Sequence, residues 1–240
     1  MKQLALICVS IVSVFVLSSA QARTAKTYPE IQTKVSSSVT ENPKRTIKIT
    51  YPFFKSRSLT DNTLNRVANG MLSRRVRIFK QHTPQTVAGF TSALDIHYSI
   101  PFFKPGKFVS LQFKQYQYTA GAAHPNTTTF VINYDFAKAR TVTFGDIFKD
   151  PIVALRDISN YSIQQLKKRN LGDDNFLNAG ARPRFDNYKN WNFTPGGLLI
   201  TFDPYQVAAY VYGPQVVVVP YALLRDHLQD TYLRLLNIKS

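Results

Sequence analysis

The sequence predicts an α+β fold, in which a meander of antiparallel β-strands forms a sheet that is packed by two to three α-helices. Two observations support this prediction. Several short segments alternate apolar with polar residues, as the two faces of a strand require, and two longer segments repeat apolar residues every three to four positions, as one face of a helix requires. A few helices packed against an antiparallel sheet define the α+β class.

The first 22 residues have the features of a secretory signal peptide. Lys2 gives a positive start, the apolar stretch 4–17 is too short to span a membrane, and residues 20–22 form an Ala-Gln-Ala cleavage site. We therefore expect cleavage after Ala22, export to the periplasm or the medium, and no membrane span in the mature chain. Cys8 is the only cysteine, so the mature chain would have no disulfide, thiolate zinc site or cysteine nucleophile.

The chain is strongly basic. It has 30 lysines and arginines against 14 acids, a formal net charge of +16, and loss of Lys2 lowers this by one to +15. Such a charge favours an anionic partner: a cell-wall polymer, lipopolysaccharide, a phospholipid surface or nucleic acid. Export argues against nucleic acid, which leaves an anionic cell-wall or envelope polymer. Simple solubility is the competing interpretation of the same charge.

The elements follow in order from the N-terminal side. Residues 23–43 are polar without apolar periodicity and predict a flexible leader. A single domain is expected over 44–240, and a division into two lobes, 44–100 and 101–240, is left open. Strands are predicted at 44–54, 91–100, 107–118, 127–136 and 140–144.

The clearest helix is predicted over 62–81, where apolar residues fall on one face and Thr60 or Asp61 can cap the start. Basic residues lie on the opposite face, which we interpret as an ordinary solvated surface rather than a ligand-binding ridge. Arg75 is different, because its helical position lies among the apolar residues. It is expected to pair with a buried acid or to reach a ligand.

The second half of the chain continues with a helix that begins at Asp150-Pro151, a good cap followed by proline at the first helical position, and ends near 167–169. Residues 171–190 predict a surface loop with a helical turn. Three further strands are predicted at 191–193, 198–202 and 215–219, with a hairpin turn at 195–197. Pro220 is expected to open the last helix.

The most chemically specific segment is the loop between the strands at 107–118 and 127–136. Gly121 permits a turn that other residues resist, and Pro125 holds His124 extended, so the hairpin presents an imidazole and the amide of Asn126. We interpret His124 as structural rather than catalytic. No serine elbow, H-E-x-x-H motif or phosphate loop occurs in the sequence, and the four histidines lack metal spacing. We therefore expect no catalytic residue, no metal and no cofactor.

Tyrosines gather in and beside the same segments. Tyr134 is expected to pack between the sheet and the helices, whereas the stretch 205–213 predicts a loop, where binding is more frequent than packing. Binding and packing remain equally open for the tyrosines of this loop. The candidate binding residues are Arg75, Tyr116, Tyr118, His124, Asn126, Asp203, Tyr205, Tyr210 and Tyr212.

Three sets of short motifs carry a family resemblance. Asn65 lies near the start of a helix that follows a Tyr-Pro strand. The other two sets are Tyr118…Gly121-Ala-Ala-His124-Pro with Asn133-Tyr-Asp and Phe144-Gly-Asp-Ile-Phe148, and Phe193-Thr-Pro-Gly-Gly-Leu198 with Pro204-Tyr205…Gly213 and Val219-Pro-Tyr221. In this order they resemble the extracytoplasmic domain of RsiV-type anti-sigma factors. A similar domain precedes the catalytic domain of PdaC-type peptidoglycan deacetylases.

The resemblance extends from about residue 44 to 228 and implies an α+β fold, a place in the cell envelope, and recognition of cell-wall glycan or of a wall-acting protein such as lysozyme. Ala122 stands where the family pattern usually has a second glycine. The sequence shows no cytoplasmic sigma-binding segment, no membrane span and no deacetylase domain. We therefore expect neither a membrane-tethered anti-sigma factor nor a deacetylase.

Three functional hypotheses follow. The first is an exported, non-catalytic envelope protein that binds an anionic glycan through the hairpin at His124, the loop at 205–213 and nearby basic residues. The second is a protein-binding module for a lysozyme-like hydrolase. Charge argues against it for ordinary lysozymes, because they are basic too. The third, ranked last, is a hydrolase built on His124 and an acid such as Asp203.

Overall fold

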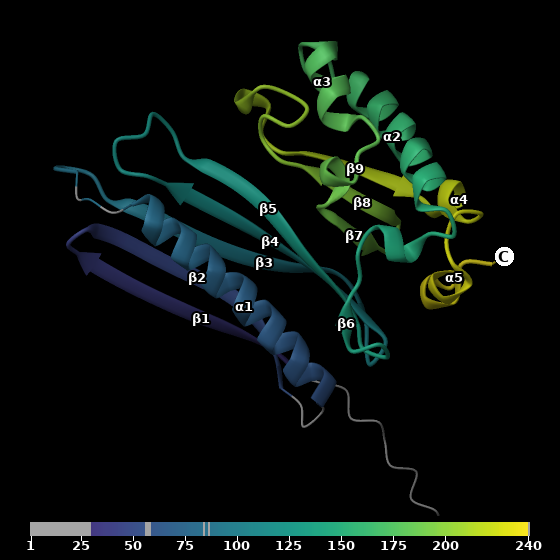
Figure 1. Cartoon of the computed structure of the whole chain (residues 1–240), viewed down its shortest axis with the longest axis horizontal. Helices are drawn as coiled ribbons and strands as arrows, with labels where there is room; N and C mark the ends of the chain where they lie inside the picture. Colours follow the sequence, from purple (N-terminus) through teal and green to yellow (C-terminus); the bar gives the residue numbers. More distant parts are fainter. Residues whose placement is uncertain (1–29, 56–58, 84, 86, 240) are drawn as a thin grey trace, which may run out of the picture.

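The computed structural model describes residues 30–55, 59–83, 85 and 87–239 (Figure 1). The predicted signal peptide at 1–22 and residues 23–29 of the predicted leader lie outside this part. The α+β prediction is confirmed, but the strands form two sheets rather than one. The larger sheet has the order β1-β2-β3-β4-β5-β6 and the smaller β7-β8-β9.

The strands of the larger sheet are β1 (Glu30–Glu41), β2 (Lys44–Lys55), β3 (Ser92–Lys104), β4 (Phe108–Tyr118), β5 (Asn126–Asp135) and β6 (Arg140–Thr141). The predicted antiparallel meander is present from β3 to β6. In contrast, β2 and β3 pair in parallel. A parallel pair needs a long crossover, and helix α1 (Leu59–His82) provides it.

The leader prediction differs from the structure over Glu30–Glu41, which forms the edge strand β1 and pairs with β2 along its whole length. Nearly all β1 side chains are exposed, and Val35 and Val39 are 61% and 69% exposed. A strand with two exposed faces shows no apolar alternation. Backbone hydrogen bonds to β2, rather than side-chain burial, therefore hold this segment.

Helix α1 covers one face of the larger sheet (Figure 1). Its buried apolar side chains follow the predicted 3.6-residue period: Leu64, Ala68, Leu72 and Phe79. Asn65 fixes the start of the helix to the end of β2. Its Nδ2 donates to the carbonyl of Phe54 at 2.9 Å and its Oδ1 accepts from the amide of Phe54 at 3.0 Å.

The smaller sheet consists of β7 (Trp191–Thr194), β8 (Gly197–Phe202) and β9 (Gln215–Pro220). Its helices are α2 (Pro151–Lys167), α3 (Asp174–Ala181), α4 (Tyr221–Leu224) and α5 (Asp230–Leu236). The predicted cap of α2 is present, because the Asp150 carboxylate accepts from the amides of Ile152 and Val153. Residues 171–190 contain α3 rather than only a loop, and the last predicted helix is divided into α4 and α5.

Strand β4 lies between two hydrophobic cores. Val109, Leu111 and Phe113 belong to the core under α1, and Phe108 belongs to the core of the smaller sheet. This arrangement does not support a division at residue 100, because β3 and β4 pair across that boundary. The two halves of the molecule instead share β4.

Buried polar side chains join the two sheets. Ser110 Oγ donates to Asn133 Oδ1 at 2.6 Å, and Asn133 Nδ2 donates to the carbonyl of Trp191 at 2.8 Å. Gln112 Nε2 donates to Asn192 Oδ1 at 3.2 Å and to Thr201 Oγ1 at 3.1 Å. We call these five side chains the polar seam. A buried network of this kind specifies one docking geometry, because any slip leaves polar atoms without partners.

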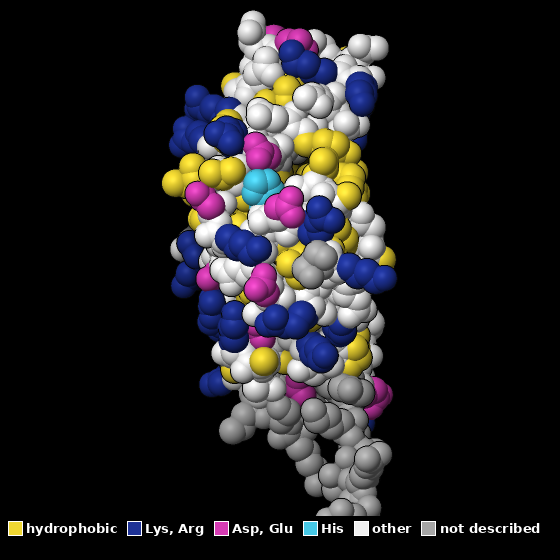
Figure 2. All heavy atoms as spheres, turned by 90° about the vertical axis from the view of Figure 1, so that its right-hand side faces the viewer, with side chains coloured by type: hydrophobic (Ala, Val, Ile, Leu, Met, Phe, Trp, Pro, Cys, Tyr) yellow, Lys and Arg dark blue, Asp and Glu magenta, His cyan; other side chains and the backbone are white. Residues whose placement is uncertain are grey.

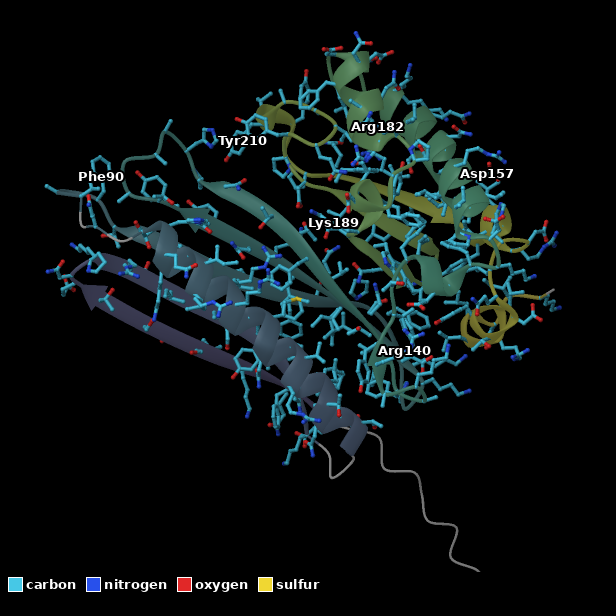
Figure 3. All side chains as sticks on the ribbon, in the orientation of Figure 1. Phe90, Arg140, Asp157, Arg182, Lys189 and Tyr210 are labelled. Carbon is cyan, nitrogen blue, oxygen red and sulfur yellow. The ribbon has the colours of Figure 1, made fainter. Side chains whose placement is uncertain are left out.

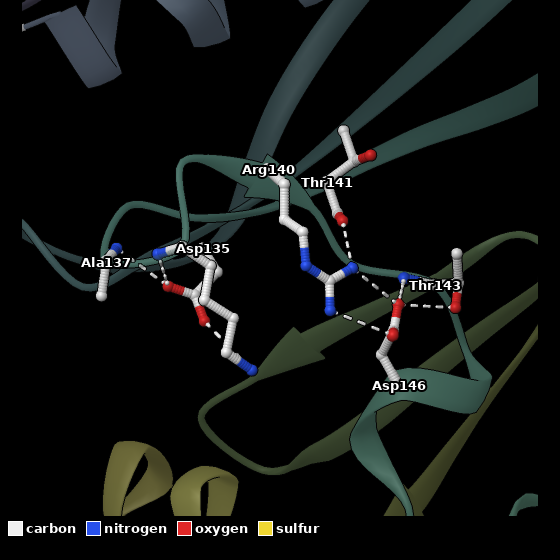
Figure 4. Close-up of polar contacts among 7 residues, drawn as sticks. Asp135, Ala137, Arg140, Thr141, Thr143 and Asp146 are labelled. Carbon is white, nitrogen blue, oxygen red and sulfur yellow. Dashed lines mark hydrogen bonds and ion pairs between the residues drawn. The ribbon is translucent and has the colours of Figure 1, made fainter.

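The chain passes from β6 to the smaller sheet through a turn held by Asp146 (Figure 4). Asp146 accepts from both terminal nitrogens of Arg140, at 3.1 and 3.3 Å, and from the amide and hydroxyl of Thr143, both at 2.7 Å. The Arg140 side chain is the main cause that lowers the pKa of Asp146 from 3.8 to about 2.

Among the described residues, no helix has both the length and the apolar character that crossing a membrane requires.

Replacing Asn133 by alanine should lower the free energy of unfolding by about 2–3 kcal/mol, because Ser110 and the Trp191 carbonyl would lose a buried partner. Chemical denaturation measures this change. Asn126→Ala, at the exposed start of the same strand, is the matched control and should stay within about 0.5 kcal/mol of the parent. Equal losses in the two variants would contradict a stabilising role for the polar seam.

Replacing Asp146 by asparagine should cost about 1–2 kcal/mol near neutral pH, allowing for solvent screening at this partly exposed group. A carboxyl group with a lowered pKa stabilises the fold above its unfolded value, and that stabilisation disappears as pH falls. The difference between parent and variant should therefore shrink between pH 3.8 and about 2. Asp186→Asn, at an 89% exposed side chain, is the matched surface control and should change the free energy of unfolding near neutral pH by less than about 0.5 kcal/mol.

Candidate functional site

The hairpin between β4 and β5 has the predicted turn. The amide of Ala122 donates to the carbonyl of Thr119 at 2.9 Å, and Gly121 has a φ of 86°. This left-handed conformation favours glycine. The turn thus keeps its hydrogen bond although Ala122 stands where the family pattern has a glycine. His124 is exposed near the tip of the hairpin.

The loop after β8, residues 203–213, lies against this hairpin. Asp203 Oδ1 accepts from the amide of Thr129 on β5 at 2.8 Å, and Asp203 Oδ2 accepts from Asn190 Nδ2 at 3.3 Å. Tyr210 Oη donates to the carbonyl of Pro125 at 2.9 Å. Figure 3 labels Tyr210 on the part of the loop that reaches toward the hairpin. These bonds fix two segments about 80 residues apart against each other.

Three rings meet at this contact, and we call His124, Tyr205 and Tyr210 the aromatic cluster. The rings of His124 and Tyr210 stack with centroids 4.1 Å apart, and those of Tyr205 and Tyr210 lie 5.6 Å apart at 30°. Tyr205 Oη lies 3.4 Å from His124 Nε2, and His124 Nδ1 lies 2.9 Å from the carbonyl of Pro125. Because Tyr205 is 52% exposed, the cluster offers a ring face to solvent.

Tyr205 has an unusual backbone, with a φ of 66°. Residues with a side chain rarely adopt this conformation, and it costs about 1 kcal/mol or more. The contacts of its neighbours Asp203 and Gln206 hold the loop in place: Gln206 Nε2 donates to the carbonyls of Gly180 and Asn187. A strained backbone that displays an exposed aromatic ring is typical of a binding loop.

Charged groups surround Asp203, which lies two residues before Tyr205 of the aromatic cluster. Burial raises the pKa of Asp203, and the hydrogen bonds from Thr129 and the charge of Lys189 oppose that shift. Arg75 comes from α1, with its guanidinium carbon 4.5 Å from the centre of the Phe130 ring. Burial lowers the pKa of Arg75 and the charge of Asp203 opposes that shift. Asp203 thus interacts with one cation from each half of the molecule, Arg75 of α1 and Lys189, and Figure 3 labels Lys189 on the side of the smaller sheet that faces the larger one.

Four other candidate residues are not members of the aromatic cluster. Within the described residues, no hydrogen bond or ring contact joins Tyr116, Tyr118, Asn126 or Tyr212 to the aromatic cluster. Tyr116 stands on β4 opposite Asp95 and Thr127 and is 42% exposed. Tyr212 lies near Gly172, which precedes α3. The described residues also contain no group of three or more His, Cys, Asp and Glu side chains placed to hold a metal ion.

Sequence reasoning missed one pair of titratable residues. His227 Nε2 lies 3.2 Å from Asp157 Oδ2, between the segment after α4 and the middle of α2. The two residues are 70 positions apart, and nothing in their local sequence signals the contact. His124, which the sequence favours as the chemically interesting histidine, has no carboxylate partner among the described residues.

The strain at Tyr205 can be tested by comparing two substitutions that both remove its ring. Glycine adopts a φ of 66° freely and alanine does not. We expect Tyr205→Gly to be more stable than Tyr205→Ala by about 1 kcal/mol in chemical denaturation. At Tyr116, on a regular strand, the order should reverse. Equal stabilities of the two Tyr205 variants would show that the backbone there is unstrained.

Comparison with known proteins adds sequence and structural relatives. Residues 145–222 match the family model described as a protein of unknown function, DUF3298. The chain is 30% identical over 190 residues to the peptidoglycan-N-acetylmuramic acid deacetylase PdaC of Bacillus subtilis (strain 168), in an alignment that covers 77% of this chain and 39% of PdaC. The chain thus spans about two fifths of that relative.

Two solved structures share the fold. A DUF3298 family member from Bacteroides fragilis NCTC 9343 gives a TM-score of 0.64 and one from Pseudomonas aeruginosa PAO1 gives 0.62. Each is 16% identical, with 85% of this chain and 95% of the other covered. The matched family segment begins at the turn after β6 and ends just after β9, so it contains the loop of the aromatic cluster. The chain carries a DUF3298 domain, and its resemblance to the RsiV- and PdaC-type extracytoplasmic domain is confirmed.

Proposed function

We propose that this protein is a non-catalytic component of the cell envelope that binds an anionic cell-wall glycan through the aromatic cluster and the cations beside it. The exposed ring of Tyr205, held over the stacked rings of Tyr210 and His124, is the observation that carries the proposal. A flat aromatic ring with a hydroxyl group suits the apolar face and polar edges of a sugar.

Homology and charge support the same proposal. The relative PdaC is named for peptidoglycan N-acetylmuramic acid, a sugar that carries a carboxyl group. The chain has a formal net charge of +16, and the charges of Arg75 and Lys189 act on Asp203, two residues before Tyr205. Long-range electrostatic attraction brings an anionic polymer to such a surface, and the rings then make the close contacts that depend on the shape of the sugar.

The polar contacts of His124 and Asp203 favour binding over catalysis. Both oxygens of Asp203 already accept hydrogen bonds, from Thr129 and Asn190. His124 contacts the carbonyl of Pro125 and the hydroxyl of Tyr205. A general base needs a partner that orients it and an open path to water or a substrate hydroxyl. The third hypothesis, a hydrolase built on these two residues, therefore remains ranked last.

A protein partner is the second candidate function, and one observation favours it. Val211, at the tip of the same loop, is 83% exposed, and its neighbour Tyr212 is 43% exposed. Apolar and aromatic side chains displayed together are typical of protein-binding surfaces. A wall-acting hydrolase is the partner that we propose for this alternative, through residues 205–212.

Binding to purified peptidoglycan sacculi tests the first proposal. Binding should weaken as salt rises, because the polymer is anionic. Tyr205→Ala should weaken binding by about fivefold to tenfold. Tyr116→Ala removes a comparably exposed tyrosine outside the aromatic cluster and should leave binding unchanged. Retention no greater than that of a charge-matched basic protein, or an unaffected Tyr205→Ala variant, would refute the proposal.

The same variants distinguish the alternative. A wall-acting hydrolase such as lysozyme should bind one-to-one in high salt if the loop tip is a protein-binding surface. In that case Val211→Asp should abolish binding to the hydrolase, because it places a charge in a desolvated contact. Loss of hydrolase binding with salt, or a Val211→Asp variant that binds normally, would count against this alternative.

A further inference from the structure

A concave site lies at the other end of the smaller sheet, between α2, the end of β9 and α4. It has a volume of about 340 Å³. The residues that line it are Asp157, Ile158, Asn160, Tyr161, Gln164, Val219, Leu223, Leu224 and His227. We call it the α2–α4 pocket. It shares no residue with the aromatic cluster, and Figure 3 labels Asp157 and Tyr210 at different ends of this half of the molecule.

Two backbone hydrogen bonds hold the main chain of His227, and Asp157 contacts its imidazole. The His227 amide donates to the carbonyl of Leu224 at 3.0 Å, and the His227 carbonyl accepts from the amide of Lys149 at 2.8 Å. Asp157 Oδ2 lies 3.2 Å from His227 Nε2, so Nδ1 is the ring nitrogen left for a ligand. The His227 side chain is 22% exposed, which places it in the pocket wall rather than on the open surface.

The two walls of the pocket differ in chemistry. Three residues of α2, Asp157, Asn160 and Gln164, lie three to four positions apart and so project from one side of the helix. They offer a carboxylate and two amides, with the Tyr161 hydroxyl beside them. The opposite wall is aliphatic, from Val219, Leu223 and Leu224. A sugar ring has the same division, with hydroxyl groups at its edge and C–H groups on its face.

The lining of this pocket lacks the basic residues that are frequent elsewhere in the chain. None of its lining residues is a lysine or an arginine, although the chain has 30 of them. Figure 2 shows the corresponding side of the molecule, where acidic side chains lie next to a histidine and lysine and arginine side chains surround them. Arg156 Nε lies 3.4 Å from Asp157 Oδ1 and offsets the charge of that carboxylate, and the lining offers no lysine or arginine to pair with an anion, so the pocket favours neither a cation nor an anion. A neutral ligand fits this balance.

We propose that the α2–α4 pocket binds a neutral ligand of monosaccharide size that carries adjacent hydroxyl groups. Asn160, Gln164, Asp157 and the free Nδ1 of His227 form hydrogen bonds to the hydroxyl groups. Leu223, which is 52% exposed, covers the apolar face of the ring, above the buried Val219 and Leu224. A volume of about 340 Å³ lies within the range of small-molecule sites. This site is separate from the proposed anionic-glycan site and does not depend on it.

Titration with N-acetylglucosamine tests the inference, observed by NMR of the Tyr161 ring and the His227 imidazole. We expect saturable shifts of both at millimolar sugar. Leu223→Trp fills the pocket from a half-exposed position and should weaken binding by about tenfold or more. Asn160→Ala should also weaken it. Asp226→Asn, at an 87% exposed side chain outside the pocket, is the matched control and should bind as the parent does.

Two comparisons keep the outcomes separate. Glucuronic acid, an anionic sugar of similar size, should bind more weakly than N-acetylglucosamine. Tyr205→Ala should leave the titration unchanged, whatever its effect on sacculi. The inference is overturned if neither the Tyr161 nor the His227 signal moves, if binding survives Leu223→Trp, or if glucuronic acid binds more tightly.

Discussion

The position of the aromatic cluster depends on the polar seam between the two sheets. The rings come from two segments, the β4–β5 hairpin and the loop after β8, that belong to different sheets. Hydrophobic contact alone would allow the smaller sheet to slide over the larger one. Ser110, Gln112 and Asn133 on one side bind Asn192, Thr201 and the Trp191 carbonyl on the other, and they fit in one register only.

Asp203 fixes the relative position of the two sheets at the edge of the molecule as well. It follows β8 directly and accepts from the amide of Thr129, on the edge of β5 that pairs with β6 only at Tyr134 and Asp135. The next residues, Pro204 and Tyr205, therefore leave the sheet at a fixed point. The strained φ of Tyr205 then turns its ring toward His124. A chain of contacts thus leads from the buried seam to the exposed ring.

Local patterns predicted most elements of this fold from the sequence. Alternation identified β4 and β5, and the Asp150-Pro151 pair marked the start of α2 within a residue. Failures occurred where the local signal is absent. The strand β1 buries almost no side chain, and the glycine- and asparagine-rich α3 is marked only by its cap Asp173, whose side chain accepts from the amide of Asn175. The division into two sheets depends on nonlocal pairing, which periodicity does not encode.

The candidate sites show the same limit. The sequence named His124, Tyr205 and Tyr210 from their loops, but their stacking depends on a contact across about 80 residues. Tyr116 and Tyr118 alternate on β4 in a way that cannot distinguish an open surface from a covered one. The pairing of His227 with Asp157 had no local signal at all, since it arises where α4 ends against the side of α2.

Strand β4 contributes Val109, Leu111 and Phe113 to the core under α1, and it meets the smaller sheet through Phe108 and the polar Ser110 and Gln112. Loss of order in the smaller sheet would therefore expose Phe108 and leave the buried polar groups of Ser110 and Gln112 without partners. In thermodynamic terms the two halves constitute one cooperative unit, so calorimetric and van't Hoff enthalpies of thermal unfolding should agree. Partial opening would then be confined to elements that pack on one side only, such as β1 at the sheet edge and α5 near the C-terminus.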